Sequence, residues 1–336
     1  MSDELRQLAD EIGRRSFEAR VGHRGLPEPF DDELWRVLEA SGLTRLTSDQ
    51  GADPADAAVV LGVLARYAAA VPVAETDLLA AWLATRANLS VPADGPLVVA
   101  IADAEARDGR IAGIAVDVPW PAAGPVVLAA RGAEATFVAT LEQPAEATTH
   151  NLAGEPRGVV AFDLSLGDVV ELPRSVGDEL VRRGAWARCV QIIGAFDAAV
   201  HLTTAHTGER KQFGRALNKF QAVQHSLAAM IGEVERGRAA TALAIAAANG
   251  HGFDSQRADY AVTVAKVAVG RAVGPVTTIA HQLHGAIGVT AEHQLWLATM
   301  RARSWADEFG TTGRHARRLG RMALAADDPW SFVVGH

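Results

Sequence analysis

Two short polar segments hold the side chains best suited to binding a ligand. The first, Gly208–Gly214, reads Gly-Glu-Arg-Lys-Gln-Phe-Gly and lies between two long segments with helical periodicity. Arg210 and Lys211 suit a phosphate or pyrophosphate, because backbone N–H groups, the helix dipole and a guanidinium can converge at the start of a helix. A charged turn between two helices would contain the same residues, so this segment alone leaves both interpretations open.

The second segment, Gln282–His293, reads Gln-Leu-His-Gly-Ala-Ile-Gly-Val-Thr-Ala-Glu-His. Gly285 and Gly288 allow another group to approach the backbone closely, and Gln282 and His284 offer hydrogen bonds. By itself this pattern is also typical of a corner between two helices.

Common catalytic motifs are missing. The sequence contains no G-x-S-x-G, no Walker loop and no H-E-x-x-H, and the glycines from Gly285 to Gly288 follow a predicted helix rather than a strand. The spacing of His201, His206 and His225 does not define a metal site. Cys189 is the single cysteine, which excludes an intrachain disulfide and a cysteine-based metal cluster. We therefore expect no metal.

Composition narrows the class of protein. The chain has 336 residues, of which 49% are hydrophobic and 21% charged, as in a globular protein of two or three domains. Its formal net charge of -8 argues against a nucleic-acid partner. The N-terminus lacks the signal-peptide pattern, and apolar runs such as Ala239–Asn249 are too short to cross a bilayer. We expect a cytoplasmic protein that does not act at a membrane.

The elements that must position the two segments follow from periodicity. Three domains are predicted, 1–92, 93–172 and 173–336, in the order helical, β and helical bundle. The first has helical spacing, with expected helices at Ala57–Ala70 and Glu75–Leu89, the latter with Thr76 and Asp77 near its start.

The middle domain should form a small antiparallel sheet or barrel, with strands at Leu97–Ile101, Ile111–Val118, Val126–Ala130, Ala135–Leu141 and Val159–Leu164. The last domain should be a four-helix bundle of Gly177–Thr207, Ala216–Ala248, Asp254–His284 and Ala291–Glu308. Gly250 and Gly285 are the expected C-caps, and Pro275 should kink or perturb the third helix. The predicted fold is mainly α with a small middle β domain.

Taken together and in this order, the polar segments resemble the acyl-CoA dehydrogenase family. The resemblance rests on Glu209–Gly214, Phe220–His225, Gln282–Gly288 and Glu292-His293, and the predicted domain order agrees with that family's fold. It implies that the chain binds FAD and an acyl-CoA thioester. In the family a glutamate takes the α proton, and N5 of the flavin takes the β hydride.

The resemblance also implies which residues hold the cofactor. In the family's dimers, the two segments grip the ADP part of the neighbouring subunit's FAD. The matching positions here are Arg210, Gln212, Phe213, Gln221, Gln282, His284, Gly285 and Gly288. Thr311 is a further expected cofactor-binding residue outside the two segments. A bidentate contact between Arg210 and a pyrophosphate is consistent with guanidinium chemistry.

The sequence departs from the family pattern where the base should lie. The family's catalytic glutamate belongs to a Y-E-G-T stretch, and Phe309 occupies its position in Glu308–Thr311. Phenylalanine cannot accept a proton, so Glu308 or Asp307 is the fallback. A second family location for the base falls at Arg182–Ala185, where Glu179 is the nearest carboxylate. The middle domain also lacks the family's I-T-E-P and W-I-T-N signatures, which hold the flavin ring.

The chain lacks the catalytic glutamate but keeps the residues that bind the ADP part of FAD. This combination suits a subunit that completes a partner's active site. The chain is similar to the short subunits of heteromeric actinobacterial acyl-CoA dehydrogenases of sterol side-chain degradation. This resemblance implies an α2β2 heterotetramer with a longer homologue that carries the glutamate, an acyl-CoA substrate that could be a steroid side-chain CoA, and an electron-transfer flavoprotein as acceptor. The alternatives are a self-sufficient homomeric enzyme with a relocated base, or a structural or otherwise non-dehydrogenase member.

The bundle should also carry the subunit contact. The Ala- and Val-rich segment Val262–Val273 is expected to be buried against another subunit, because the family's long bundle helices form its tetramer core. Alternatively, these residues fill the chain's own core.

Overall fold

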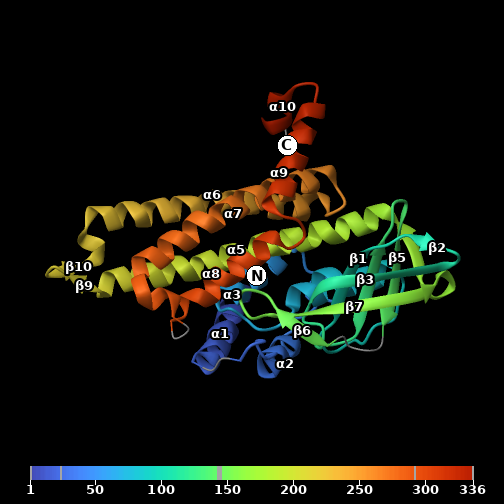
Figure 1. Cartoon of the computed structure of the whole chain (residues 1–336), viewed down its shortest axis with the longest axis horizontal. Coiled ribbons are helices and arrows are strands. Elements are labelled where there is room, and N and C mark those ends of the chain that lie inside the picture. The colour runs from blue at the N-terminus through green and yellow to red at the C-terminus, as the bar shows by residue number, and fades with distance from the viewer. Residues whose placement is uncertain (1, 23–24, 142–145, 291–292, 335–336) are drawn as a thin grey trace. The chain divides into compact units, whose positions relative to one another are not determined.

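The computed structural model describes residues 2–22, 25–141, 146–290 and 293–334 (Figure 1). The chain divides into two compact units. The first consists of Met1–Ala57 and Ala69–Gly184, and the second of Ala58–Ala68 and Ala185–His336. The predicted boundary at residue 92 falls inside the first unit, so the division into three domains stays a prediction.

The first unit begins with helices, as the periodicity predicts. They are α1 (Ser2–Arg20), α2 (Asp32–Ala40), α3 (Pro54–Arg66), which continues into the second unit, the π-helix η1 (Glu75–Ala81) and α4 (Trp82–Arg86).

Thr76 and Asp77 do not cap this last pair of helices. Asp77 is buried and accepts hydrogen bonds from the backbone N–H groups of Thr47 and Ser48, and burial raises its pKa. Thr76 exchanges hydrogen bonds with the backbone of Leu97. Both side chains therefore tie η1 to neighbouring segments, which sequence periodicity cannot reveal.

Two four-stranded sheets complete the first unit. One has the order β1 (Val98–Asp103), β4 (Val126–Arg131), β5 (Ala135–Leu141) and β8 (Val170–Pro173). The other has the order β2 (Ala106–Arg107), β3 (Arg110–Pro119), β7 (Pro156–Ser165) and β6 (Ala147–His150). The five predicted strands are confirmed, but β1 and β4 run parallel, so the purely antiparallel expectation is wrong.

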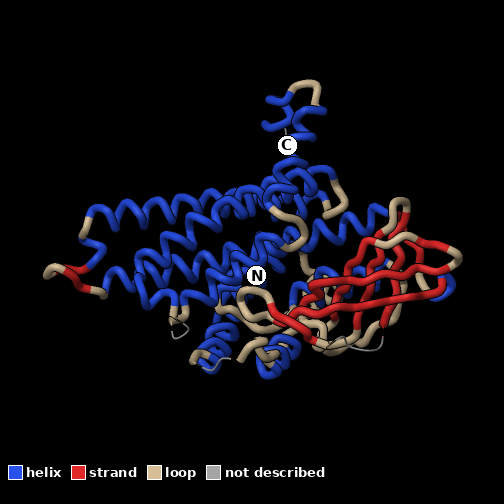
Figure 2. The backbone as a smooth tube through the Cα atoms, in the orientation of Figure 1, coloured by secondary structure: helices blue, strands red, loops and turns tan. Residues whose placement is uncertain are grey.

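The second unit is almost entirely helical (Figure 2). Its long helices are α5 (Arg174–Glu209), which begins in the first unit, α6 (Gln221–His251) and α7 (Gln256–His284), followed by α8 (Leu295–Asp307). A small hairpin of β9 (Lys211–Gln212) and β10 (Arg215–Ala216), with the 3-10 turn η3 (Leu217–Lys219), joins α5 to α6, and η4 (Gly285–Val289) follows α7. The four predicted bundle helices are thus present.

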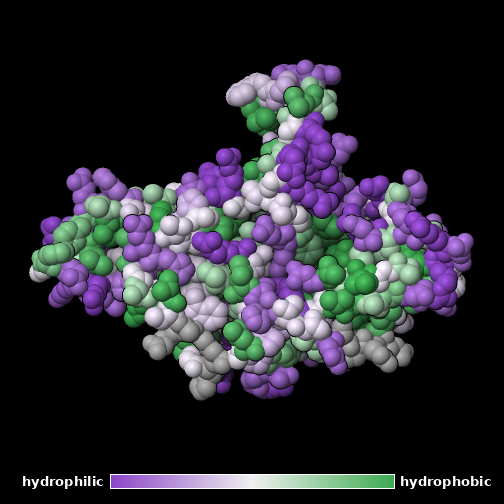
Figure 3. Space-filling model, in the orientation of Figure 1, coloured by the Kyte–Doolittle hydropathy of each residue, from purple (hydrophilic) through white to green (hydrophobic). Residues whose placement is uncertain are grey.

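The chain ends in two helices that sequence periodicity did not single out, α9 (Thr312–Ala325) and α10 (Pro329–Val334). Figure 3 shows a hydrophilic surface over α9 and a mixture of hydrophilic and hydrophobic residues over α10, where Val333 and Val334 are exposed. Short amphipathic segments such as these give weaker sequence signals than the long bundle helices.

Details of the bundle helices correct two expectations and confirm a third. Gly250 lies inside α6, and Gly252, with φ 79°, is the C-cap instead. Gly285 does cap α7, as predicted, with φ 66°. The helix α7 runs through Pro275 without interruption. The predicted start of α8 at Ala291, like Glu292 of the family motif, lies outside the described residues.

The helix α7 lies in the core of the bundle. Val262, Val269 and Ala272 are buried within the chain itself, so the prediction that Val262–Val273 faces another subunit is wrong.

By length and composition, Gln256–Val289 could cross a membrane, contrary to the expectation from apolar runs. Half of that window is buried inside the protein, as in the core helix of a bundle.

Candidate functional site

The first polar segment forms a tight hairpin, here called the Arg210 turn (Arg210–Arg215). Gln212 pairs with Arg215, which leaves Phe213 and Gly214 as a two-residue loop. Their φ values of 49° and 79° are those of a type I′ turn. The carbonyl of His206 accepts from the N–H of Arg210, so the turn continues directly from the end of α5.

Phe213 is an unusual residue for this position. A positive φ is uncommon for a bulky side chain, and turns of this type favour Asn or Gly. The side chain is 92% exposed and meets only the edge of Phe220 among the described rings, with centroids 6.2 Å apart. Strain that presents an exposed aromatic ring is typical of a binding position.

The second polar segment forms the Gly285 corner (His284–Val289), between α7 and α8. The Nδ1 of His284 lies 2.8 Å from the Ala280 carbonyl and donates to it, which leaves Nε2 as an acceptor. The corner needs Gly288, because a Cβ there would lie 2.6 Å from the Cβ of His284. The side chains of Gln282 and Ile287 stay exposed at the same corner.

Three histidines connect the turn to the corner. The ring of His206, from the last turns of α5, stacks on His284 with centroids 4.5 Å apart. His293 meets His284 edge-on at 4.7 Å. Burial lowers the pKa of His206 and His293, and lowers the pKa of His284 to about 4. The three rings are therefore neutral near pH 7, and they hold the two segments side by side.

The exposed groups here fit a phosphate-bearing ligand from outside the chain. Arg210, Gln212, Gln221 and Gln282 are exposed, and among the described residues none of these side chains has a hydrogen-bond partner. The guanidinium and the amides are donors that match phosphate oxygens and a purine. The exposed ring of Phe213 offers a stacking surface. The structure therefore brings together the cofactor-binding residues predicted from the two segments.

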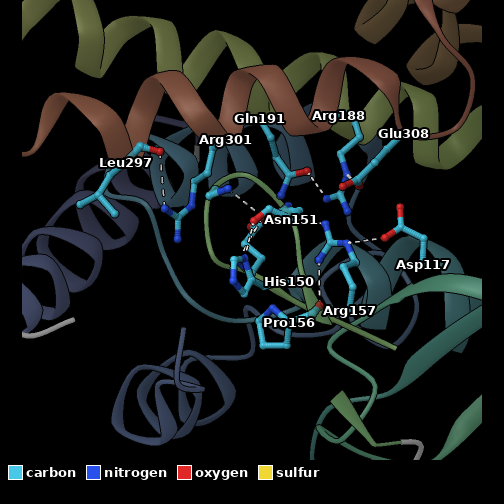
Figure 4. Close-up of polar contacts among 12 residues, drawn as sticks. Asp117, His150, Asn151, Pro156, Arg157, Arg188, Gln191, Leu297, Arg301 and Glu308 are labelled. Carbon is cyan, nitrogen blue, oxygen red and sulfur yellow. Dashed lines mark hydrogen bonds and ion pairs between the residues drawn. The ribbon is translucent and has the colours of Figure 1, made fainter. Parts of the chain in front are cut away.

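The segment that should hold the base is organised differently. In the Glu308 loop (Glu308–Thr311), Oε2 of Glu308 lies 2.6 Å from Nε of Arg188, as Figure 4 shows. The side chain of Arg188 is 3% exposed and that of Glu308 15%. Arg188 also donates to Gln191 at 2.6 Å, and its guanidinium lies over the ring of Phe309. Glu308 is thus committed to a buried ion pair.

Two further groups fix the backbone of this loop. Nζ of Lys266, buried in α7, donates to the carbonyls of Ala306 and Glu308, both at 2.8 Å. Burial lowers the pKa of this ammonium group. Nε2 of His315 lies 3.2 Å from the Phe309 carbonyl, and burial lowers the pKa of His315 to about 4. These contacts hold Phe309 at φ 54° in the left-handed region.

Thr311 does not lie with the other predicted cofactor residues. Its side chain caps α9 by accepting from the N–H of Arg314 at 3.2 Å. The next residue, Thr312, packs against Gly270, fourteen residues before His284 in α7, which is about 21 Å along a helix. Thr311 thus lies apart from the two polar segments within the chain, and its role in cofactor binding stays a prediction.

Glu179, the nearest carboxylate to the second family location for the base, also forms an ion pair. It is buried and pairs with Arg183 at 2.9 Å within α5, so the second family location offers no uncommitted carboxylate in the described structure. Among the described residues, no group of three metal-ligating side chains could hold an ion. Sequence reasoning missed Arg188 and Lys266, which lie far from the loop in sequence and carry no motif.

Comparisons with known proteins point to one family. A family model described as "Acyl-CoA dehydrogenase, C-terminal domain" matches residues 178–324. A curated protein of Mycolicibacterium smegmatis, acyl-CoA dehydrogenase IpdE2, is 29% identical over 94% of this chain and 93% of its own length. The chain is therefore similar to the acyl-CoA dehydrogenase family over nearly its whole length, and residues 178–324 match that family's C-terminal domain. Both polar segments lie inside the matched C-terminal domain.

Solved structures share the fold over the whole chain. The ChsE4–ChsE5 complex from Mycobacterium tuberculosis matches with a TM-score of 0.83 and 21% identity, covering 97% of each chain. A Tcur3481–Tcur3483 steroid ACAD variant matches with a TM-score of 0.82 and 23% identity, covering 96% of this chain and 97% of that one. The acyl-CoA dehydrogenase fold predicted from the sequence is confirmed.

Proposed function

We propose that this chain is a subunit of an FAD-dependent acyl-CoA dehydrogenase whose partner subunit supplies the catalytic glutamate. One observation carries the proposal. Phe309 holds the family's base position, and its neighbour Glu308 is locked to the buried Arg188 at 2.6 Å. A general base must reach the proton that it removes, and a carboxylate held by a buried guanidinium is committed elsewhere.

The chain's contribution is to bind the ADP part of FAD from the partner's site. Arg210 pairs with the pyrophosphate, the open backbone at Gly285 allows close approach, and the amides of Gln212 and Gln282 donate hydrogen bonds. Phe213 packs its ring on the cofactor. When bound, FAD accepts the β hydride of the acyl-CoA thioester, while the α proton goes to the partner's carboxylate.

The partner in this proposal is a longer family member that keeps the glutamate, in an α2β2 heterotetramer. Support comes from the fold shared with the ChsE4–ChsE5 complex. A steroid side-chain CoA is the proposed substrate class, supported by the likeness to a steroid ACAD. Electrons leave to an electron-transfer flavoprotein, and the enzyme works in the cytoplasm.

Co-expression with such a homologue tests the proposal. The purified complex should be yellow and active, whereas this chain alone should have no dehydrogenase activity. Turnover should vanish when the partner's glutamate is replaced by glutamine. The variant Glu308→Gln should stay within a few-fold of wild type, because losing a true base costs about 10² or more.

Three results would contradict the proposal. If Glu308→Gln alone abolishes turnover while flavin stays bound and the fold is intact, this subunit carries its own base. If the chain purified alone is yellow and turns over acyl-CoA, it is a self-sufficient homomeric enzyme. A colourless complex without turnover would favour a structural member of the family.

A further inference from the structure

His206 joins the two polar segments through two different groups. Its backbone carbonyl accepts a hydrogen bond from the N–H of Arg210 at 2.9 Å, where α5 ends. Its ring stacks on that of His284 with centroids 4.5 Å apart and planes 21° apart. His284 directly precedes Gly285, which is exposed at the corner. A path of one hydrogen bond and one ring stack therefore runs from the Arg210 turn to the Gly285 corner.

The rings that His206 packs against are themselves anchored to the backbone. Nδ1 of His284 donates to the carbonyl of Ala280 at 2.8 Å, one turn earlier in α7. Nδ1 of His293 accepts from the N–H of Leu295, at the start of α8, at 3.1 Å, and its ring meets that of His284 edge-on. The stack therefore fixes the end of α5 against α7 and α8.

The stack depends on neutral rings. Two imidazolium ions at this separation would repel each other, and Arg210, one turn after His206, adds a further positive charge. Burial lowers the pKa of His206, Arg210 lowers it further, and Glu209 raises it. Burial also lowers the pKa of His284 to about 4. Near pH 7 the rings therefore add no positive charge beside Arg210, and nothing drives them apart.

The ring of His284 carries a cost that packing alone does not require. Its Nε2 is buried and has no hydrogen-bond partner among the described residues, which is unfavourable. An apolar side chain could fill a buried position without that cost. A polar ring kept beside an open corner is typical of a functional position. His206, itself only half-buried, covers this ring from the side of α5.

We infer that His206 is a positioning residue for the cofactor. Its ring and its carbonyl set the spacing between the guanidinium of Arg210 and the Gly285 corner, so that one ADP group contacts both. The inference rests on the proposed binding of FAD by these two segments. It adds a residue that lies outside both segments and carries no motif of its own.

Equilibrium binding of FAD to the flavin-free complex with the longer subunit tests the inference. His206→Ala removes the ring, and FAD affinity should fall about tenfold while the circular dichroism of the complex stays that of wild type. His206→Phe keeps a ring that can stack, and should stay within about threefold of wild type. His201→Ala removes an exposed histidine of the same helix and should bind FAD as wild type does.

A double-mutant cycle separates positioning from a purely structural role. If His206 acts through Arg210, His206→Ala should weaken FAD binding by less than about threefold once Arg210 is already alanine. Independent structural effects would instead multiply. ADP, which lacks the flavin ring, serves as a second probe and should show the same pattern, because the inference concerns the ADP group.

His206→Gln keeps a helix-forming polar side chain without an aromatic ring, and carries the same expectation where the alanine variant does not fold. The inference is overturned if His206→Ala and His206→Gln bind FAD as wild type does while Arg210→Ala does not, and the proposed function then stands. It is also overturned if the two alanine effects multiply, or if His206→Phe binds as weakly as His206→Ala. Unchanged FAD affinity in Arg210→Ala would contradict the proposed cofactor binding itself, and the inference with it.

Discussion

The Arg210 turn and the Glu308 loop belong to the same helical unit but use their charged residues in opposite ways. At the turn, Arg210 is exposed and unpaired among the described residues, and Phe213 is held open to solvent. At the loop, Arg188 and Lys266 are buried, and both bind the loop itself. The first arrangement leaves hydrogen-bonding capacity for a ligand, and the second consumes it within the chain.

This difference shows that residues at the position of a family's catalytic motif can take purely structural roles while the fold around them is kept. The Glu308 loop keeps a glutamate and a threonine, yet Glu308 serves an ion pair and Thr311 caps a helix. The following predictions test whether the two regions differ as the geometry indicates.

The largest effect should come from breaking the loop's ion pair. Arg188→Ala leaves the buried carboxylate of Glu308 without its guanidinium, which costs about 3–5 kcal/mol of unfolding free energy. Urea denaturation followed by circular dichroism measures it. Arg110→Ala, which breaks the exposed pair with Asp163, should cost less than about 1 kcal/mol. Equal effects would mean that the Arg188 pair does not organise the loop.

Acid should destabilise both regions, and the two histidines with the most strongly lowered pKa are His284 at the corner and His315 at the loop. The pKa of His284 at the corner and of His315 at the loop is lowered by burial to about 4, below the value near 6.5 of an unfolded chain. The unfolded state therefore binds protons first, and stability that is complete above pH 6.5 falls as the pH drops toward 4. Each histidine accounts for up to about 3 kcal/mol.

Single variants separate the two contributions. His284→Asn and His315→Asn should each flatten part of the stability profile between pH 6.5 and 4, measured by urea denaturation. A profile that neither variant changes would assign the acid sensitivity to other groups.

At the turn, the effect should fall on the ligand rather than on the fold. Arg210→Ala removes a charge-assisted contact worth about 1.5–3 kcal/mol, so FAD affinity of the complex should drop about 10- to 100-fold. Arg210→Lys should rescue it partly, because lysine lacks the bidentate fork. Lys211→Ala is the neighbouring control, and flavin content unchanged in Arg210→Ala would remove this residue from the site.

The smallest effect separates Thr311 from the cofactor residues. Thr311→Ala loses the N-cap of α9, which costs about 1 kcal/mol of stability. Flavin content should not change, since the next residue, Thr312, packs against Gly270, about 21 Å along α7 from His284. Thr311→Ser should keep the stability of wild type. Loss of flavin in Thr311→Ala with an unchanged melting temperature would return Thr311 to the site.

Sequence patterns predicted much of the fold because their signals are local. Long apolar periodicity located the four bundle helices within a few residues, and Ala135–Leu141 matches β5 throughout. The Arg210 turn and the Gly285 corner were also recognisable, since glycines, an arginine and glutamines stand close together in the sequence. The parallel pairing of β1 with β4 was not recognisable, because the sequences of two strands that are far apart in the chain do not show in which relative direction the strands pair.

The sequence by itself determined the order of helical, β and bundle segments, the two polar segments between bundle helices, and the lack of a carboxylate at Phe309. Only the tertiary structure decided that Glu308 is locked, because Arg188 lies 120 residues away and reaches it through the packing of α5 beside the loop. It also decided that α7 fills the core and α6 keeps an open face, since both helices are rich in alanine and differ only in what surrounds them.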